Sequence, residues 1–503
     1  MGRCMTGLGL GLMAVLLLCP LVPAFDFSKI ENKVVEHTLD NGLPLLILPR
    51  HDAPVVSFVI TVNTGCAEDP LGYMGMAHMF EHMAFKGTEE IGSKDLKTEM
   101  KWMAEEDRIF NLLFEERAKG DLADSARLAE LEKQLDEAAD SAKQYVETNE
   151  FARIVSREGG NGLNAKTSYD NTVYYINYPS NKLELWMAME SDRFLNPVLR
   201  ELFKEKQVIE EERRFRVESS PTGKLFLNEF LGLAFNSHPY GKCLIGEMSE
   251  IRNYNRPVMQ KRFGTYYVPR NMAIGIVGDV DPKEVIRLAK KYFGRLEDRP
   301  EPPPVMIDES KPYGVRKSVM TENAQPMFIM GYRVPSVRHT DFPALEALSA
   351  YLGSGRTSVL YKKLVKEKKS AVQVSAMVGF PAAKYPSLFG VYCIPSNERT
   401  NAENEADALT EIDRVRNELI PEEELEKIKA KAKAGFINGL ESNSGLAEQL
   451  VYYQLTMGNW RELFKELDRF NALTTEDIMR VAKQYLDPNK RFVAYIEKPE
   501  DDG

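Results

Sequence analysis

The sequence predicts a protein of two related halves, each built from β-strands and α-helices. Its 503 residues exceed what one ordinary hydrophobic core holds. A proline-rich stretch at residues 299–313 can continue neither a helix nor a central strand, so it is the expected linker. Each side of it opens with an apolar strand pattern followed by a helical pattern, at Val55–Val62 and Gly75–Phe85 and again at Met327–Tyr332 and Phe342–Leu352.

The two halves are interpreted as a diverged duplication, with domains expected at residues 25–298 and 314–503. When their opening elements are aligned, the first half carries an extra segment. Residues 104–149 account for it, because they are rich in Glu, Lys and Ala and place leucines at helical spacing. We therefore expect an inserted antiparallel helix pair. It would serve as a solvated spacer or, in the alternative, dock a partner or substrate.

The first 24 residues have the pattern of a secretory signal peptide. Arg3 gives a short positive region, residues 8–23 an apolar core, and Val22–Ala24 a small-residue cleavage site. We expect an exported protein, periplasmic or secreted, with an uncleaved membrane anchor as the less favoured interpretation. No later apolar run is long enough to span a bilayer, so no stable membrane insertion is expected after cleavage.

Net charge and cysteine usage exclude two classes of function. A net charge of −10 has the wrong sign for a protein whose main partner is a nucleic-acid backbone. Beyond the expected signal, Cys66, Cys243 and Cys393 stand far apart and form no CxxC pair. Neither a disulfide framework nor a thiolate metal site is expected, so each cysteine is interpreted as a small buried apolar residue.

Two histidines four residues apart are the strongest chemical signal in the chain. His78 and His82 would lie on one face of a helix, within reach of a single metal ion, with Glu81 beside them. The surrounding residues are mostly Met, Ala and Phe, which indicates a buried segment, and buried imidazoles need partners. Because a catalytic zinc takes three protein ligands and leaves a fourth position for water, a further ligand must come from elsewhere.

The best source of this further ligand is an acidic helix expected at residues 201–216. Glu205 and Glu212 stand seven residues apart on it and therefore share one face. Runs of charge usually mark solvated surfaces, so the residues alone do not select one glutamate.

With these motifs the chain resembles the M16 family of metallopeptidases, the group of pitrilysin, insulinase and mitochondrial processing peptidase, which carries the inverted His-x-x-Glu-His motif. The resemblance extends over roughly residues 34–498. Its matching blocks include residues 75–88, 164–167, 205–212, 238–241 and 277–279.

The resemblance implies a zinc-dependent metalloendopeptidase that hydrolyses peptides or unfolded polypeptides and holds one Zn²⁺ per chain. Besides the two histidines, the third ligand would be Glu212, and Glu211 is the main alternative. Glu205 would not bind the metal itself but would contact the ligands and hold them in place. Glu81 would be the catalytic general base that activates water. The alternative is a non-catalytic or partner-dependent peptide-binding subunit of an M16-type complex.

The fold implied by the resemblance is α+β. Each half would be a sandwich of the type found in LuxS and in mitochondrial processing peptidase, with a mostly antiparallel sheet covered by helices. The paired halves would enclose a chamber in which peptides bind extended. Asn164 and Ala165 match the family's edge strand and are expected to bind substrate through main-chain hydrogen bonds.

The second half resembles the family's inactive-type domain. Ala347, Ala350 and Tyr351 align with the three motif residues, and Gly435 aligns with Glu212. These four residues do not provide a set of metal ligands in place of the two imidazoles and the carboxylate, so no second metal site is expected.

A further departure concerns residues that contact substrate near the metal. Many members carry an Arg and a Tyr seven residues apart in the second half, where this chain has Val365 and Val372. Short members commonly work as dimers, so we expect a dimer. We hypothesise a heterodimer in which a related M16 subunit supplies the Arg and the Tyr, and a homodimer that uses other residues is the alternative.

Overall fold

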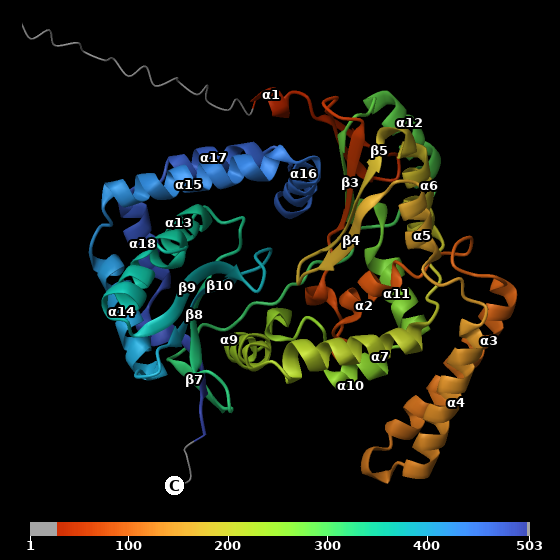
Figure 1. Ribbon diagram of the computed structural model, residues 1–503, viewed down its shortest axis with the longest axis horizontal. Coiled ribbons are helices and arrows are strands. Elements are labelled where there is room, and N and C mark those ends of the chain that lie inside the picture. The colour runs from red at the N-terminus through yellow and green to blue at the C-terminus, as the bar shows by residue number, and fades with distance from the viewer. Residues whose placement is uncertain (1–27, 500–503) are drawn as a thin grey trace, which may run out of the picture.

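The computed structural model describes residues 28–499, which form two β-sheets with helices on both faces of each sheet (Figure 1). The signal peptide expected at residues 1–24 lies outside the described residues. Within residues 28–499 no helix is both long enough and apolar enough to cross a membrane.

The first sheet has the strand order β1-β2-β6-β3-β5-β4, and only its β2–β6 pair is parallel. Strands β3 and β6 are buried along nearly their whole length, because their side chains meet helices on both faces. The strands are β1 (Val35–Thr38), β2 (Pro44–Pro49), β3 (Val55–Val62), β4 (Asn161–Thr167), β5 (Thr172–Pro179) and β6 (Met272–Gly278).

The second sheet repeats this arrangement. Its order is β7-β11-β8-β10-β9, and again a single pair, β7–β11, is parallel. These five strands take the places of β2, β6, β3, β5 and β4, which confirms the expected α+β fold of two homologous halves. The strands are β7 (Arg316–Thr321), β8 (Met327–Val334), β9 (Ala371–Phe380), β10 (Ser387–Pro395) and β11 (Phe492–Glu497).

The helices occupy the segments between the strands. Those before the linker are α1 (Ser28–Glu31), α2 (Met76–Met83), α3 (Leu96–Arg117), α4 (Ser125–Lys143), α5 (Glu150–Arg157), α6 (Leu183–Leu195), α7 (Leu202–Arg213), α8 (Pro221–Gly223), α9 (Leu231–Ala234), α10 (Met248–Asn253), α11 (Arg256–Tyr266) and α12 (Pro282–Tyr292). Those after it are α13 (Phe342–Gly353), α14 (Asn401–Asn417), α15 (Glu422–Glu441), α16 (Asn443–Met457), α17 (Glu462–Asn471) and α18 (Thr475–Tyr485).

Several shorter helical turns complete the chain. The wider π-helical turns are η4 (Arg214–Glu218), η5 (Lys224–Phe230) and η9 (Tyr361–Glu367). The 3₁₀ turns are η1 (Cys66–Glu68), η2 (Gly120–Leu122), η3 (Ser180–Lys182), η6 (Pro239–Gly241), η7 (Pro269–Asn271), η8 (Phe293–Arg295) and η10 (Pro488–Lys490).

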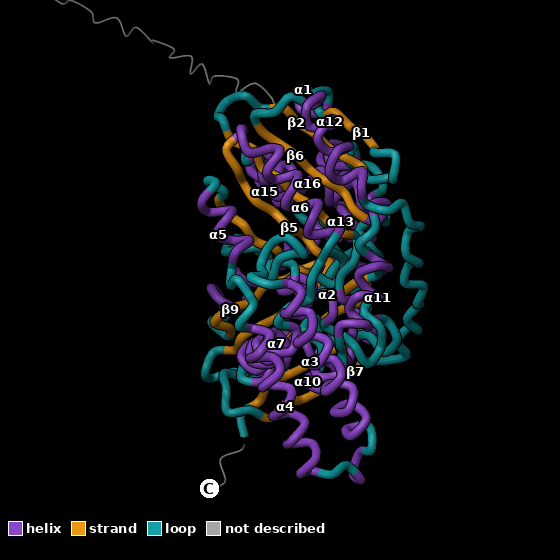
Figure 2. Tube along the Cα trace, turned by 90° about the vertical axis from the view of Figure 1, so that its right-hand side faces the viewer, coloured by secondary structure: helices purple, strands orange, loops and turns teal. Residues whose placement is uncertain are grey.

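Helices α3 and α4 form the expected antiparallel pair, which projects away from both sheets (Figures 1 and 2). The two helices meet through a small apolar seam, as the leucine spacing predicts. This seam contains Ile109, Leu113, Leu131 and Ala138.

The pair begins earlier than the expected residue 104, and two contacts explain the difference. The carboxylate of Asp95 accepts a hydrogen bond from the backbone of Thr98 at 3.2 Å, which caps the start of α3. One turn later the fully buried Glu99 accepts a hydrogen bond from Arg200 at 2.9 Å, so the first turns of α3 are anchored to the body of the first half.

Each half sends helical segments across to the sheet of the other half. Helix α16 covers the face of the first sheet that is turned toward the second half, where Ala447 and Val451 pack against strands β2 and β6 (Figure 1). In return η5 and α9 cover the second sheet, where Phe230 and Leu231 pack among residues of β8, β10 and β11. The linker at 299–313 thus divides the strands of the two sheets in sequence. Helix α16, η5 and α9, however, each pack on the sheet whose strands lie on the other side of the linker.

A polar contact joins the same two halves. Asp170, in the turn between β4 and β5, accepts hydrogen bonds from the backbone of Ala383 at 3.0 Å and of Lys384 at 2.9 Å, in the loop between β9 and β10. The hydroxyl of Tyr240 donates to the same carboxylate. Lys384 also pairs with Glu68 at 3.0 Å, so the loop is held by two carboxylates of the first half.

The three cysteines of the described residues are free and buried. The thiol of Cys66 donates to the carbonyl of Leu244 at 3.0 Å, and burial raises the pKa of Cys66 well above its usual value. These cysteines therefore pack as the small apolar residues expected from their spacing.

Replacing Asp170 should loosen the contact between the halves. Asp170→Ala removes the acceptor for two backbone amides and one hydroxyl, at a cost of about 1–3 kcal/mol for each group left buried without a partner. We expect a lower melting temperature and faster proteolysis within residues 381–386. Asp170→Asn keeps one acceptor oxygen, so its melting temperature should lie between those of the wild type and Asp170→Ala. Equal melting temperatures for all three proteins would show that this contact does not stabilise the pairing.

Candidate metal centre

The candidate centre is built on α2, whose start is fixed by a glycine and a buried aspartate. Gly75 precedes the helix with a φ of 90°, and a Cβ there would lie 2.1 Å from the carbonyl oxygen of Ile245. Asp69 accepts hydrogen bonds from the backbone of Gly75 at 2.9 Å and of Ala77 at 3.2 Å. Arg262 pairs with this carboxylate at 2.6 Å, so the first turn of α2 has one defined position.

Helical spacing then separates the two faces of α2. Met76, Met79, Phe80 and Met83 are buried in the first core, beneath the sheet. The two histidines emerge from the opposite side, toward α7, with their ring centroids 4.8 Å apart.

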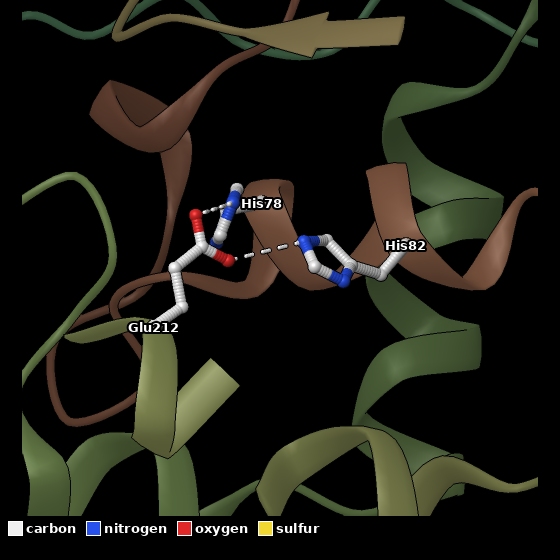
Figure 3. Close-up of side chains that lie close together, drawn as sticks. All are labelled: His78, His82 and Glu212. Carbon is white, nitrogen blue, oxygen red and sulfur yellow. Dashed lines mark ion pairs between the residues drawn. The ribbon is translucent and has the colours of Figure 1, made fainter. Parts of the chain in front are cut away.

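Glu212 on α7 meets both imidazoles (Figure 3). Its Oε1 lies 3.6 Å from Nε2 of His78, and its Oε2 lies 3.5 Å from Nε2 of His82. One ligand atom from each of the three residues can be chosen so that all lie within 4.8 Å of one another. Ligand atoms on a tetrahedral zinc, at bond lengths of about 2.0–2.1 Å, are about 3.4 Å apart, so the two nitrogen-to-oxygen separations fit one shared ion.

The rival glutamate points elsewhere. Glu211 is exposed and forms an ion pair with Arg214 on the outer side of α7. The structure therefore brings Glu212, and not Glu211, to the histidines.

Glu205 stands behind His82. Its Oε1 lies 2.9 Å from Nδ1 of His82, and its Oε2 lies 2.7 Å from Nζ of Lys86, which also reaches Glu201 at 3.3 Å. A carboxylate at Nδ1 fixes the ring orientation and turns the lone pair of Nε2 outward, as outer partners of metal-binding histidines do.

The two imidazoles have opposite proton affinities. Burial and the neighbouring ring of His82 lower the pKa of His78 to about 4. Burial also opposes protonation of His82, but hydrogen bonds and attraction from Glu205 and Glu212 raise its pKa to about 9. The cluster of carboxylates thus favours a positive charge at the position between His82 and Glu212.

Glu81 lies on the same helix and is half-buried. In the part of the chain that is described, its carboxylate has no hydrogen bond or ion pair with another residue. An unpaired carboxylate beside a group of possible metal ligands is free to accept a proton.

Asn164 and Ala165 lie on β4, which ends the first sheet and pairs only with β5. Asn164 is exposed and Ala165 is buried, so the strand presents alternating faces. This strand packs beside α2, which leaves its outer edge close to the histidine helix.

Comparison with known proteins identifies the family of this chain. Residues 46–107 and 138–247 match the family model described as insulinase (peptidase family M16), and residues 253–432 match the peptidase M16 inactive domain. The zinc protease PqqE of Helicobacter pylori is 30% identical over 497 residues, which cover 97% of this chain and 98% of that protein. The chain belongs to peptidase family M16. The stretch that the first model leaves unmatched, 108–137, falls within the α3–α4 pair.

Other M16 relatives agree with this membership. A probable mitochondrial-processing peptidase subunit beta of Schizosaccharomyces pombe is 23% identical over 466 residues, covering 89% of this chain and 88% of that one. The crystal structure of a protease from Helicobacter pylori superposes with a TM-score of 0.76 at 27% identity, over 92% of this chain and 99% of that chain. The periplasmic protease PqqL of Escherichia coli shares the fold with a TM-score of 0.66 at 18% identity, and this chain spans 48% of its length.

The second M16 half has no comparable cluster among the residues that the structure describes. Ala347 and Tyr351 are buried in α13, and Gly435 lies on α15. Val365 packs against the second core, whereas Val372 is 64% exposed on β9.

Three residues near the centre were not singled out by the sequence. Asp69 caps α2, Lys86 holds Glu205, and Arg216 pairs with Glu212 at 3.0 Å. Lys86 and Arg216 each stand four residues after a candidate ligand, which is a usable signal for contact on a helix. Asp69 gives no such signal, because its partners are set by the loop before α2.

The start of α2 can be tested with two alanine variants. Gly72 and Gly75 share a positive φ, of 86° and 90°, but only Gly75 has a neighbour within 4 Å of an added Cβ. Gly72→Ala should cost only the strain of a left-handed residue, about 1–2 kcal/mol. Gly75→Ala should lower the melting temperature further, since it also forces α2 away from Ile245. Similar melting temperatures for the two variants would contradict this account.

Proposed function

We propose that this M16 chain is a zinc-dependent endopeptidase that hydrolyses peptides or unfolded polypeptides, with His78, His82 and Glu212 as metal ligands. The observation that carries the proposal is the approach of both Nε2 atoms to the two oxygens of one carboxylate, at 3.5 and 3.6 Å. The relatives named as zinc proteases support the same choice of metal.

The residues present fit zinc in number, type and charge. Two imidazoles and one carboxylate are the donor set of a hydrolytic zinc site, which keeps one position open. The high proton affinity of His82 supports the fit, because a cation bound there would replace that proton between the ring and the carboxylates. When bound, zinc supplies Lewis acidity, which lowers the pKa of a water and polarises a carbonyl oxygen.

Glu81 is the proposed general base. It would accept a proton from the water that attacks the peptide carbonyl and would return a proton to the leaving amine. Its half-buried carboxylate, without an ion-pair partner among the described residues, supports this role. Glu205 would position the His82 ring, while Lys86 keeps the Glu205 carboxylate turned toward the ring.

The substrate would bind as an added strand along β4. An edge strand captures an extended peptide through main-chain hydrogen bonds, which gives affinity without a strict choice of sequence. The backbone at Asn164 and Ala165 lies on this edge, beside the helix that carries Glu81. We therefore propose broad peptide substrates.

Dimerisation and export complete the proposal. Short M16 members commonly work as dimers, so we propose a dimer. Because Val365 and Val372 supply no polar group, the working hypothesis is a heterodimer with a related M16 subunit. Export follows from the signal sequence expected at residues 1–24. The second candidate function, a peptide-binding subunit that is inactive without its partner, is favoured only by these same valines.

Substitutions at the centre should separate chemistry from metal binding. Glu81→Gln should keep one zinc per chain and lower kcat/KM by about 100-fold to 10,000-fold, because the proton acceptor is lost. His78→Ala should lose the metal itself. Metal analysis beside cleavage of a peptide library measures both effects, and Glu211→Gln is the matched control, since that side chain points away. Normal cleavage by Glu81→Gln would refute the proposed mechanism.

Dependence on a partner has its own test. The purified chain should cleave peptides slowly, and a related M16 subunit recovered with it from the source should raise the rate, because it adds polar contacts that the valines lack. Full activity of the isolated chain would rule out the heterodimer and favour the homodimer.

A further inference from the structure

An arginine stands against the carboxylate that faces both histidines. Nε of Arg216 lies 3.0 Å from Oε1 of Glu212, the oxygen that is 3.6 Å from Nε2 of His78. The Arg216 side chain is 61% exposed, and Glu212 is its only ion-pair partner among the described residues. Its guanidinium therefore reaches the edge of the cluster from the solvent side.

The helix changes type just before Arg216. Helix α7 ends at Arg213 and continues as the π-helical turn η4, in which the backbone of Ser219 donates to the carbonyl of Arg214 at 2.7 Å. Such wide turns are uncommon and occur often at functional sites. Arg216 lies in this turn, four residues after Glu212, a spacing at which helical side chains are neighbours.

The two other arginines of this segment point elsewhere. Arg213 is buried, donates to the carbonyl of Gly246 and pairs with Glu247 at 2.5 Å. Arg214 pairs with Glu211 on the outer side of the helix. Lys86, the other cation near the cluster, is held by two carboxylates. Arg216 is thus the one exposed cation among the described residues whose pairing is with a candidate ligand.

The charges explain why this pairing would open when the centre is in use. With a divalent cation on Glu212, the carboxylate no longer offers a full negative charge to Arg216, and the cation repels the guanidinium. Negative charge that develops within reach of the guanidinium would then attract it in place of Glu212. Attack of water on a peptide carbonyl creates such a charge on the carbonyl oxygen.

We propose that Arg216 is a catalytic residue that donates hydrogen bonds to the oxygen of the scissile carbonyl while that oxygen carries negative charge; this rests on the proposed function of the site. The water oxygen bonds to the carbonyl carbon, the C=O π pair moves onto the oxygen, and the water proton passes to Glu81. When the C–N bond breaks, its electron pair leaves with the nitrogen, a lone pair on the oxygen re-forms the C=O bond, and Glu81 passes its proton to the amine. Arg216 forms no covalent bond and keeps its charge, as guanidinium groups do.

The opposing interpretation is that Arg216 only steadies Glu212. The two roles predict different effects of removing Arg216. Loss of a steadying arginine lowers zinc affinity, whereas loss of an oxyanion donor raises the energy of the transition state. Because the side chain is exposed and its removal leaves no buried group unpaired, variants should fold normally. Unchanged circular dichroism and melting temperature check this first.

The test compares Arg216→Gln and Arg216→Lys with Arg214→Gln as the matched control, on one quenched peptide chosen from a library that the wild type digests. Arg216→Gln should lower kcat by about 100-fold to 1,000-fold, as loss of an oxyanion donor does, with zinc content and KM little changed. Arg216→Lys should restore part of the rate. A phosphinic analogue of that peptide, which mimics the tetrahedral oxygen, should bind Arg216→Gln more weakly by a similar factor.

Unchanged kcat in Arg216→Gln, or loss of zinc in parallel with loss of rate, would overturn the assignment of Arg216 while leaving the proposed function intact. Zinc-loaded wild type that cleaves no peptide would overturn both, because no carbonyl would then need the guanidinium. Arg214→Gln should match the wild type in every measurement, and a comparable loss there would also count against a specific role for Arg216.

Discussion

The meeting of one carboxylate with two imidazoles is the interaction on which the rest of the centre depends. Glu212 can face His78 and His82 together only if α2 and α7 keep a fixed distance and rotation. The buried Asp69–Arg262 pair fixes the start of α2, and Glu205 with Lys86 fixes one ring from behind. Each of these contacts removes a rotational freedom that would otherwise oppose binding of an ion.

The helix that carries Glu212 also links the centre to the second half. From its C-terminus the chain continues through η4 and α8 to η5 and α9, which cover the second sheet, while α16 covers the first. Separating the halves would expose an apolar face of each sheet, so the exchange favours a fixed pairing. The Asp170 contact adds a polar component to the same junction.

Local patterns predicted much of this arrangement. The strand-then-helix repeat anticipated two related halves, and the spacing of the histidines anticipated that one helix presents both. Glu212 needed the family resemblance, because charge alone does not distinguish it from Glu211. The exchanged helices, the Asp170 contact and the pairing of Glu99 with Arg200 join residues far apart in sequence, so no local pattern reports them. The last of these also explains why α3 starts before the expected residue.

Zinc-edge X-ray absorption of the purified chain, stripped of metal and reloaded with one equivalent of zinc, tests the central claim most directly. The account predicts two imidazole nitrogens and carboxylate oxygen at about 2.0–2.2 Å, with one further light atom from solvent. His82→Ala should remove one of the imidazole contributions. A spectrum with sulfur ligands, with four protein ligands, or unchanged by that substitution would contradict the account.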